Sequence, residues 1–166
     1  MNTTSTLLAA DSIDSATGNR LHSLLRSSDS ATPAVLRMAL AASIFPHGTQ
    51  KLLGWFGGYG FTGTMGFFTG TMGIPTPLAF GVIVIEFFAP LLLVLGVGTR
   101  LAALGLAVVM TTAMLMVHLR NGFFMNWFGT QAGEGIEYFL LSIGIALALL
   151  VSGGGRWSLD RYVTRS

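Results

Sequence analysis

The residues best suited to chemistry lie inside the first long apolar segment, in the run Phe-Pro-His-Gly-Thr-Gln-Lys at positions 45–51. His47 and Lys51 are four residues apart, so a helix places both on one face, with Gln50 beside them. Ionisable groups are costly at membrane depth unless they have partners, and such a residue indicates a functional site. Imidazole and ammonium groups donate hydrogen bonds and protons to a bound molecule.

The later apolar segments supply possible partners for these groups. The second segment contains Glu86, the third ends at His118, and the fourth begins with Glu134 and Glu137. If the segments are antiparallel helices, the last three residues share one end of the bundle with Lys51. Glu86 then lies roughly 13 Å below that end, from the rise of 1.5 Å per helical residue. The sequence therefore predicts one polar layer built from four helices.

Composition places the chain among membrane proteins. The sequence has 166 residues, of which 52% are hydrophobic and only 10% are charged, whereas soluble domains carry roughly 25% charge. The net charge of +2 comes without a basic block, so nothing indicates nucleic acid as a partner. With no cysteine, the chain cannot form disulfides, thiolate metal sites or cysteine redox centres.

The pattern of apolar runs predicts an all-α membrane protein, a four-transmembrane-helix bundle. The spans are expected at about 33–53, 78–97, 101–120 and 134–152 within one domain, residues 33–166. Residues 1–32 are expected to form a flexible cytoplasmic tail, without the apolar core that a signal peptide needs. Two loops rich in glycine and aromatic residues join the spans on the outer side, and residues 54–76 are expected to form a re-entrant or interfacial hairpin.

The basic residues predict the orientation of the bundle. Seven of the nine lie on the side of the N-terminus and two lie on the other side, which places both termini in the cytoplasm and the polar layer near the periplasm. Arg37 is expected to extend towards the nearer membrane surface, and residues 156–162 to form a short interfacial helix. The seven inner residues are Arg20, Arg26, Arg37, Arg100, Arg156, Arg161 and Arg165; the outer two are Lys51 and Arg120.

The chemistry of the polar layer leaves several interpretations open. In the first, Lys51 pairs with Glu137 or Glu134 and His47 pairs with Glu86, and these contacts only dock the helices. In the second, the layer is a pocket for a quinone or a similar hydrophobic redox substrate.

The quinone interpretation gives each group a task. His47, Lys51 and His118 would donate hydrogen bonds to the quinone carbonyls, and Glu86 or Glu137 would relay protons. Loop aromatics would stack on the ring. A third interpretation is a metal site of His47, His118 and Glu137, for which the sequence offers no diagnostic spacing. A fourth is transport of a proton or small solute through the layer.

Several motifs, in this order, resemble the DoxX family over about residues 33–162. They are His-Gly-Thr-Gln-Lys-Leu at 47–52, Phe-Gly-Gly-Tyr-Gly at 56–60, Gly-Ile-Pro at 73–75 before the helix with Glu86, Leu-Gly-Val-Gly-Thr-Arg-Leu-Ala-Ala at 95–103, His118, Gly-Phe-Phe at 122–124, Glu-Tyr at 137–138 and Gly-Gly-Gly-Arg-Trp-Ser-Leu-Asp at 153–160. The resemblance implies a four-helix protein of the bacterial inner membrane. Named members are linked to quinone-coupled sulfur oxidation, as a small subunit of a thiosulfate–quinone oxidoreductase, and to membrane oxidoreductase complexes.

Residues and resemblance together predict a multi-pass inner-membrane subunit of a quinone-linked oxidoreductase system. The alternative is a non-catalytic anchor or assembly subunit of a larger complex. Expected partners are membrane lipid and either a partner protein subunit or a second copy of the chain. No flavin, haem or iron–sulfur motif is present, and no metal site is expected. The expected catalytic residues are His47, Lys51, Glu86, His118 and Glu137, and the expected cofactor-binding residues are Gln50, Trp55, Phe56 and Tyr59.

Overall fold

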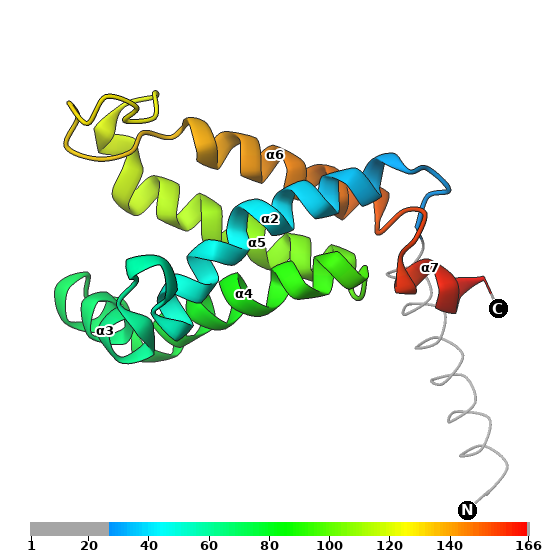
Figure 1. Ribbon diagram of the computed structural model, residues 1–166, viewed down its shortest axis with the longest axis horizontal. Helices are drawn as coiled ribbons and strands as arrows, with labels where there is room; N and C mark the ends of the chain where they lie inside the picture. Colours follow the sequence, from blue (N-terminus) through cyan, green and yellow to red (C-terminus); the bar gives the residue numbers. More distant parts are fainter. Residues whose placement is uncertain (1–26, 166) are drawn as a thin grey trace, which may run out of the picture.

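The computed structural model describes residues 27–165, and within this range every regular element is a helix. In Figure 1 the long helices run side by side, with α3 and the 121–133 loop at one end and α7 at the other. The prediction of an all-α fold is therefore confirmed. The elements are α2 (Thr32–Leu53), η1 (Trp55–Gly57), α3 (Gly60–Gly66), η2 (Phe67–Thr71), α4 (Thr76–Leu95), α5 (Thr99–Ala113), η3 (Met114–His118), η4 (Leu119–Asn121), α6 (Glu137–Ser152) and α7 (Leu159–Thr164).

Two of the described helices are long and apolar enough to cross a membrane. They are α4 and the continuous helical stretch Thr99–Asn121, while α6 is apolar but shorter. Large apolar side chains cover the outside of these helices: Leu101 is 76% exposed, Val151 79% and Leu141 65%. Side chains of this kind facing outward are typical of helices surrounded by lipid rather than water.

The bundle core consists of aliphatic side chains from all four long helices. Fully buried members are Leu40 and Ile44 of α2, Leu93 of α4, Leu106 of α5 and Leu149 of α6. Their mutual packing fixes how the helices cross, and so fixes where the polar residues of each helix lie.

Residues 54–76 differ from the loop that the sequence predicted, because much of the segment is helical. It folds as the short turn η1, the helix α3 and the π-helical turn η2. Gly58 lies directly against the backbone of Gln50, where no Cβ would fit. This close contact brings the chain back against the end of α2. The segment that follows pairs its backbone N–H and C=O groups within helical turns.

The end of the bundle near α7 is held by Arg37, which is only 2% exposed. The expectation that this side chain extends to the membrane surface is wrong. Its guanidinium donates hydrogen bonds to the carbonyls of Leu93, Val94, Gly154 and Trp157. The carbonyls of Leu93 and Val94 lie in the last turn of α4, where helices have unsatisfied acceptors, so one buried arginine caps that helix and holds the C-terminal segment.

A buried carboxylate completes the same end of the bundle. Asp160 of α7 accepts hydrogen bonds from the backbone amides of Gly98, at 2.7 Å, and Thr99, at 2.8 Å. These amides begin α5, so the carboxylate caps that helix and its charge complements the helix dipole. The short helix expected at 156–162 is present as α7, which begins later because Ser158 is its N-cap.

The predicted tail, residues 1–32, is only partly described. Residues 1–26, including Arg20 and Arg26, lie outside the described residues. The amide of Ser28 donates to the carbonyl of Ser152 at 3.2 Å, and the amide of Arg156 donates to Ser30 at 2.9 Å. The chain just before α2 therefore packs on the C-terminal segment.

Candidate functional site

A cavity of about 470 Å³ lies between the long helices at the end near α3. In Figure 1 the helices spread apart towards this end. Most of the lining is aliphatic, aromatic or methionine, and a few polar side chains interrupt it. The polar lining consists of His47, Lys51, Glu86, Thr112, His118, Glu134 and Tyr138.

The central polar feature of the cavity wall is an ion pair between Lys51 of α2 and Glu86 of α4. The ammonium nitrogen lies 2.5 Å from a carboxylate oxygen, and the side chains are 26% and 5% exposed respectively. The expected pairing of Lys51 with Glu137 or Glu134, and of His47 with Glu86, is wrong. Burying a carboxylate without a cation beside it is strongly destabilising, and Lys51 supplies that cation.

Gly48 explains why this pair forms. A Cβ on Gly48 would lie 2.6 Å from the carbonyl carbon of Glu86 and 2.8 Å from the Cα of Phe87. Helices α2 and α4 therefore touch backbone to backbone at this glycine. Lys51 lies one turn beyond Gly48 on the same face, which brings its side chain to Glu86. Pro90 cannot donate to the carbonyl of Glu86, and Gly48 packs against that carbonyl.

The two histidines lie on the cavity lining in different surroundings. His47 is exposed, with its ring 6.0 Å from the ring of Tyr138. His118 is half-buried, with its ring 4.2 Å from that of Phe139 and its Nδ1 2.9 Å from the carbonyl oxygen of Glu134. A proton on Nδ1 makes that contact a hydrogen bond and leaves Nε2 able to accept a proton.

The two acidic residues near the start of α6 hold the loop 121–133. Glu137 accepts a hydrogen bond from the amide of Met125 at 3.2 Å, and Glu134 accepts one from the amide of Asn126 at 2.6 Å. Glu134 also lines the cavity, whereas Glu137 does not. The carboxylate of Glu137 thus supports the loop that covers one side of the cavity.

The four residues expected to bind a cofactor lie outside the cavity lining. The amide of Gln50 donates to the carbonyl of Phe56 at 3.3 Å. Trp55, Phe56 and Tyr59 are 55%, 71% and 81% exposed. Their rings face away from the core, as expected of aromatic residues at a membrane surface.

Other aromatic residues occupy the position that was predicted for these three. Phe67 and Phe68 of η2 and Tyr138 and Phe139 of α6 line the cavity, and the Tyr138 hydroxyl donates to the carbonyl of Ser43 at 3.3 Å. A signal for one of them exists, because Phe68 begins the second copy of the repeated motif Phe-Thr-Gly-Thr-Met-Gly.

Methionines form a second group that the sequence did not point to. Met72, Met110, Met116 and Met125 all line the cavity. Thioether side chains are flexible and polarisable, and they make favourable contacts with aromatic rings. Flexible side chains of this kind let the cavity wall adjust to the shape of a bound apolar molecule.

The metal interpretation gains no support from the geometry. Within residues 27–165, no three side chains of the histidine, cysteine, aspartate or glutamate types are grouped so that they could hold a metal ion. The set of His47, His118 and Glu137 that this interpretation requires is therefore not assembled there.

By its fold and its site, the chain belongs to the class of small helical proteins that have apolar helices of membrane length and an ion pair in a cavity between the helices. Within that class the chain belongs to the DoxX family, whose model matches residues 32–119. The chain is also 30% identical over 129 residues to a protein of Bacillus subtilis (strain 168) named "Putative oxidoreductase CatD", over 78% of this chain and 84% of that protein. No solved structure matches the chain. The matched region contains His47, Lys51, Glu86 and His118.

Proposed function

We propose that this chain is a membrane subunit of a quinone-linked oxidoreductase system, and that its cavity binds a quinone or a similar flat hydrophobic redox molecule. The observation that carries the proposal is the Lys51–Glu86 pair, with its carboxylate buried, in the wall of a largely apolar cavity. Family membership and the name of the Bacillus relative support a role linked to oxidoreductases.

The cavity suits a neutral ring that carries carbonyl groups. Its volume of about 470 Å³ is within the range of pockets for small molecules, roughly 300–1,000 Å³. The charges of Lys51 and Glu86 cancel, so the ion pair has no net charge and suits a neutral ligand. The Lys51 ammonium has three donors, of which one points to Glu86, and the others are available to a quinone carbonyl. The aromatic and methionine lining would contact the faces of the ring.

Proton transfer in this proposal uses groups already in the cavity wall. Reduction of a quinone to the quinol takes up two electrons and two protons. Lys51 delivers a proton to the reduced carbonyl oxygen, and Glu86 holds the ammonium in place. His118, through Nε2, delivers the second proton to the oxygen on the opposite side of the ring, and Lys51 and His118 each regain a proton from water at the membrane surface. The electrons come from a partner protein or directly from the substrate that is oxidised.

The proposal includes an orientation in the membrane. Helices α2, α4, α5 with its extension, and α6 are taken as four spans of the inner membrane. Both termini then lie in the cytoplasm and the cavity lies near the periplasmic face. The unequal distribution of arginine supports this arrangement, because basic residues remain preferentially on the cytoplasmic side.

The test is direct extraction of bound quinone. The full chain is purified from bacterial membranes in mild detergent, extracted with organic solvent, and the quinone is quantified per protein. We expect bound quinone in the wild type and little in Lys51→Met. Glu137→Gln is the matched control, because that carboxylate supports the loop from outside the cavity lining, and it should retain quinone.

The alternative function gives a different result. A wild-type preparation without quinone that carries a stable partner protein would support a non-catalytic anchor or assembly subunit. Equal quinone content in Lys51→Met and in the wild type would also refute the proposed site.

A further inference from the structure

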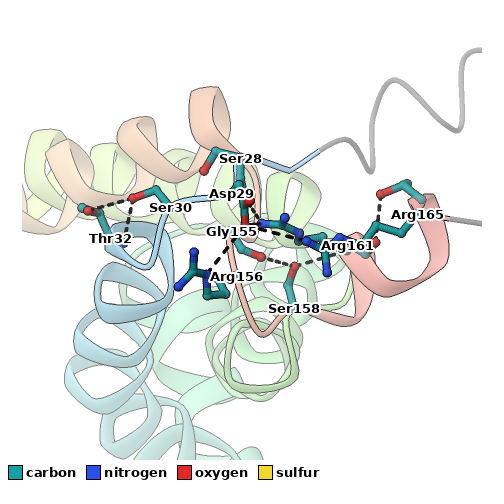
Figure 2. A network of polar contacts seen from close by, with 10 residues as sticks. Ser28, Asp29, Ser30, Thr32, Gly155, Arg156, Ser158, Arg161 and Arg165 are labelled. Atoms are coloured by element: carbon teal, nitrogen blue, oxygen red, sulfur yellow. Dashed lines mark hydrogen bonds and ion pairs between the residues drawn. The ribbon is translucent and has the colours of Figure 1, made fainter.

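At the opposite end of the molecule, three arginines surround one carboxylate. Figure 2 shows Asp29, just before α2, facing Arg156, Arg161 and Arg165 of the C-terminal segment. Asp29 forms an ion pair with Arg161, while Arg156 Nε and Arg165 Nη2 lie 3.7 Å and 3.8 Å from the same oxygen. We call these three residues the arginine cluster.

The cluster has more positive charge than Asp29 can balance. The Arg161 side chain is only 11% exposed and also donates to the carbonyl of Ser28 at 3.1 Å, so it is fixed in place. The side chains of Arg156 and Arg165 are 53% and 66% exposed. Their distances to Asp29 exceed hydrogen-bond length. Two guanidinium groups are therefore held close together and open to an external anion.

The surroundings of the cluster are hollowed and aromatic. A hollow of about 500 Å³ is lined by the cluster, Asp29, Trp157, Ser158 and Tyr162. Trp157 and Tyr162 are 73% and 76% exposed. Tryptophan and tyrosine with exposed rings are typical of the boundary between membrane and water.

The backbone holds Trp157 outward at some cost. Its φ is +63°, which is unusual for a residue with a side chain, and its carbonyl accepts a hydrogen bond from the buried Arg37 at 3.1 Å. Strained residues persist where the surrounding structure enforces them and often mark functional sites. Here the strain keeps an aromatic ring next to the arginine cluster.

We propose that the arginine cluster binds the phosphate of an anionic phospholipid, with Trp157 and Tyr162 lying at headgroup level. A guanidinium matches a phosphate with two parallel hydrogen bonds, and anionic lipids attract arginines located next to membrane-spanning helices. The site lies at the end of the apolar helices away from the cavity, so the proposal does not depend on quinone binding.

The experiment measures lipid binding by the full chain in a zwitterionic detergent. Phosphatidylglycerol, phosphatidylcholine or inorganic phosphate is titrated, and bound lipid is counted by native mass spectrometry alongside the thermal unfolding midpoint. We expect phosphatidylglycerol to bind and to raise the midpoint, whereas phosphatidylcholine and inorganic phosphate at equal concentration leave the midpoint unchanged.

Variants then locate the site. The double variant Arg156→Gln/Arg165→Gln should weaken phosphatidylglycerol binding about thirtyfold, because each arginine near an anionic surface contributes roughly a fivefold gain. Arg165→Gln alone, at the most exposed member of the cluster, should weaken it about fivefold and remains informative if the double variant does not fold. Arg120→Gln is the matched control, since Arg120 is exposed and lies in η4, and it should bind as the wild type does.

The proposal would be overturned by equal stabilisation by phosphatidylcholine, by a full effect from inorganic phosphate alone, or by unchanged phosphatidylglycerol binding in Arg165→Gln. A loss in Arg120→Gln as large as in the double variant would also overturn it, because the binding would then follow overall charge.

Discussion

The Lys51–Glu86 pair makes a quantitative prediction, because its two members are buried to different degrees. The Glu86 side chain is 5% exposed and that of Lys51 is 26% exposed. Lys51→Met leaves a buried carboxylate without its cation, which costs about 3–5 kcal/mol in the free energy of unfolding. Glu86→Gln keeps an acceptor for the ammonium, and Lys51 retains some access to water. We therefore expect this change to cost only about 1–2 kcal/mol.

The double variant Lys51→Met/Glu86→Gln removes both charges together. It leaves a neutral amide in place of a buried unpaired carboxylate, so its total cost should be about 1–2 kcal/mol. The coupling free energy of the cycle, the sum of the two single costs minus the cost of the double variant, is then about 4 kcal/mol, well above the roughly 0.6 kcal/mol average of hydrogen bonds between membrane helices.

The assay is equilibrium unfolding of the detergent-solubilised chain with increasing SDS, followed by circular dichroism. The free energy of unfolding is compared across the wild type, the two single variants and the double variant. A coupling below about 0.5 kcal/mol would mean that the pair contributes nothing to helix docking. A larger cost for Glu86→Gln than for Lys51→Met would refute the argument from unequal burial.

Three further predictions concern the contacts that position this pair and the opposite end of the bundle. Gly48→Ala places a Cβ 2.6 Å from the carbonyl carbon of Glu86, so α2 and α4 must separate, and thermal unfolding should show a loss of about 2–3 kcal/mol; Gly144→Ala, which meets open space, should cost nothing. Arg37→Met removes the side-chain donor to the carbonyls of Val94, Gly154 and Trp157, at a total of about 3–5 kcal/mol, and Arg37→Lys should not restore stability in the same assay, because an ammonium lacks the guanidinium fork. The hydrogen bond from Arg161 holds the pKa of the Asp29 carboxyl below its ordinary 3.8. The stability that this contact contributes is therefore complete above that pH and is lost as the pH falls through the lowered pKa. Hydrogen exchange of the Arg156 amide, corrected for its intrinsic rate, should accelerate below about pH 4 in the wild type and show no such step in Asp29→Asn.

The helices could be predicted from the sequence because apolar length, proline and glycine mark them well. The expected spans at 33–53 and 78–97 correspond to Thr32–Leu53 and Thr76–Leu95. Proline begins both helices and glycine follows both, as helix termini favour. The loop predicted at residues 54–76 was wrong because the prediction relied on the same signal. The many glycines of this segment indicate a loop, but contact with the end of α2 stabilises helical turns.

The meeting of ionisable residues in one layer follows from alternating helix direction alone. The structure accordingly places Lys51, Glu86 and His118 around one cavity. Their pairing could not be deduced, because it depends on which faces of α2 and α4 touch. That choice is made by Gly48, and a glycine within an apolar run gives no sign of which helix will approach it. The position of Tyr138 and Phe139 in the cavity wall could likewise not be predicted, because an aromatic residue in an apolar helix usually only packs against its neighbours.

The position of the ion pair next to the closest helix contact bears on what its charges do. Gly48 holds α2 against the backbone of Glu86, so the two helices are joined there by main-chain contact in addition to the ion pair. At the other end of the bundle, Arg37 of α2 donates to carbonyls in the last turn of α4 and joins the same two helices independently of this pair. The cavity between these helices should therefore keep its shape when the charge of Glu86 is removed. A loss of ligand binding in Glu86→Gln would then report the chemistry of the carboxylate, because the backbone contact that shapes the cavity remains.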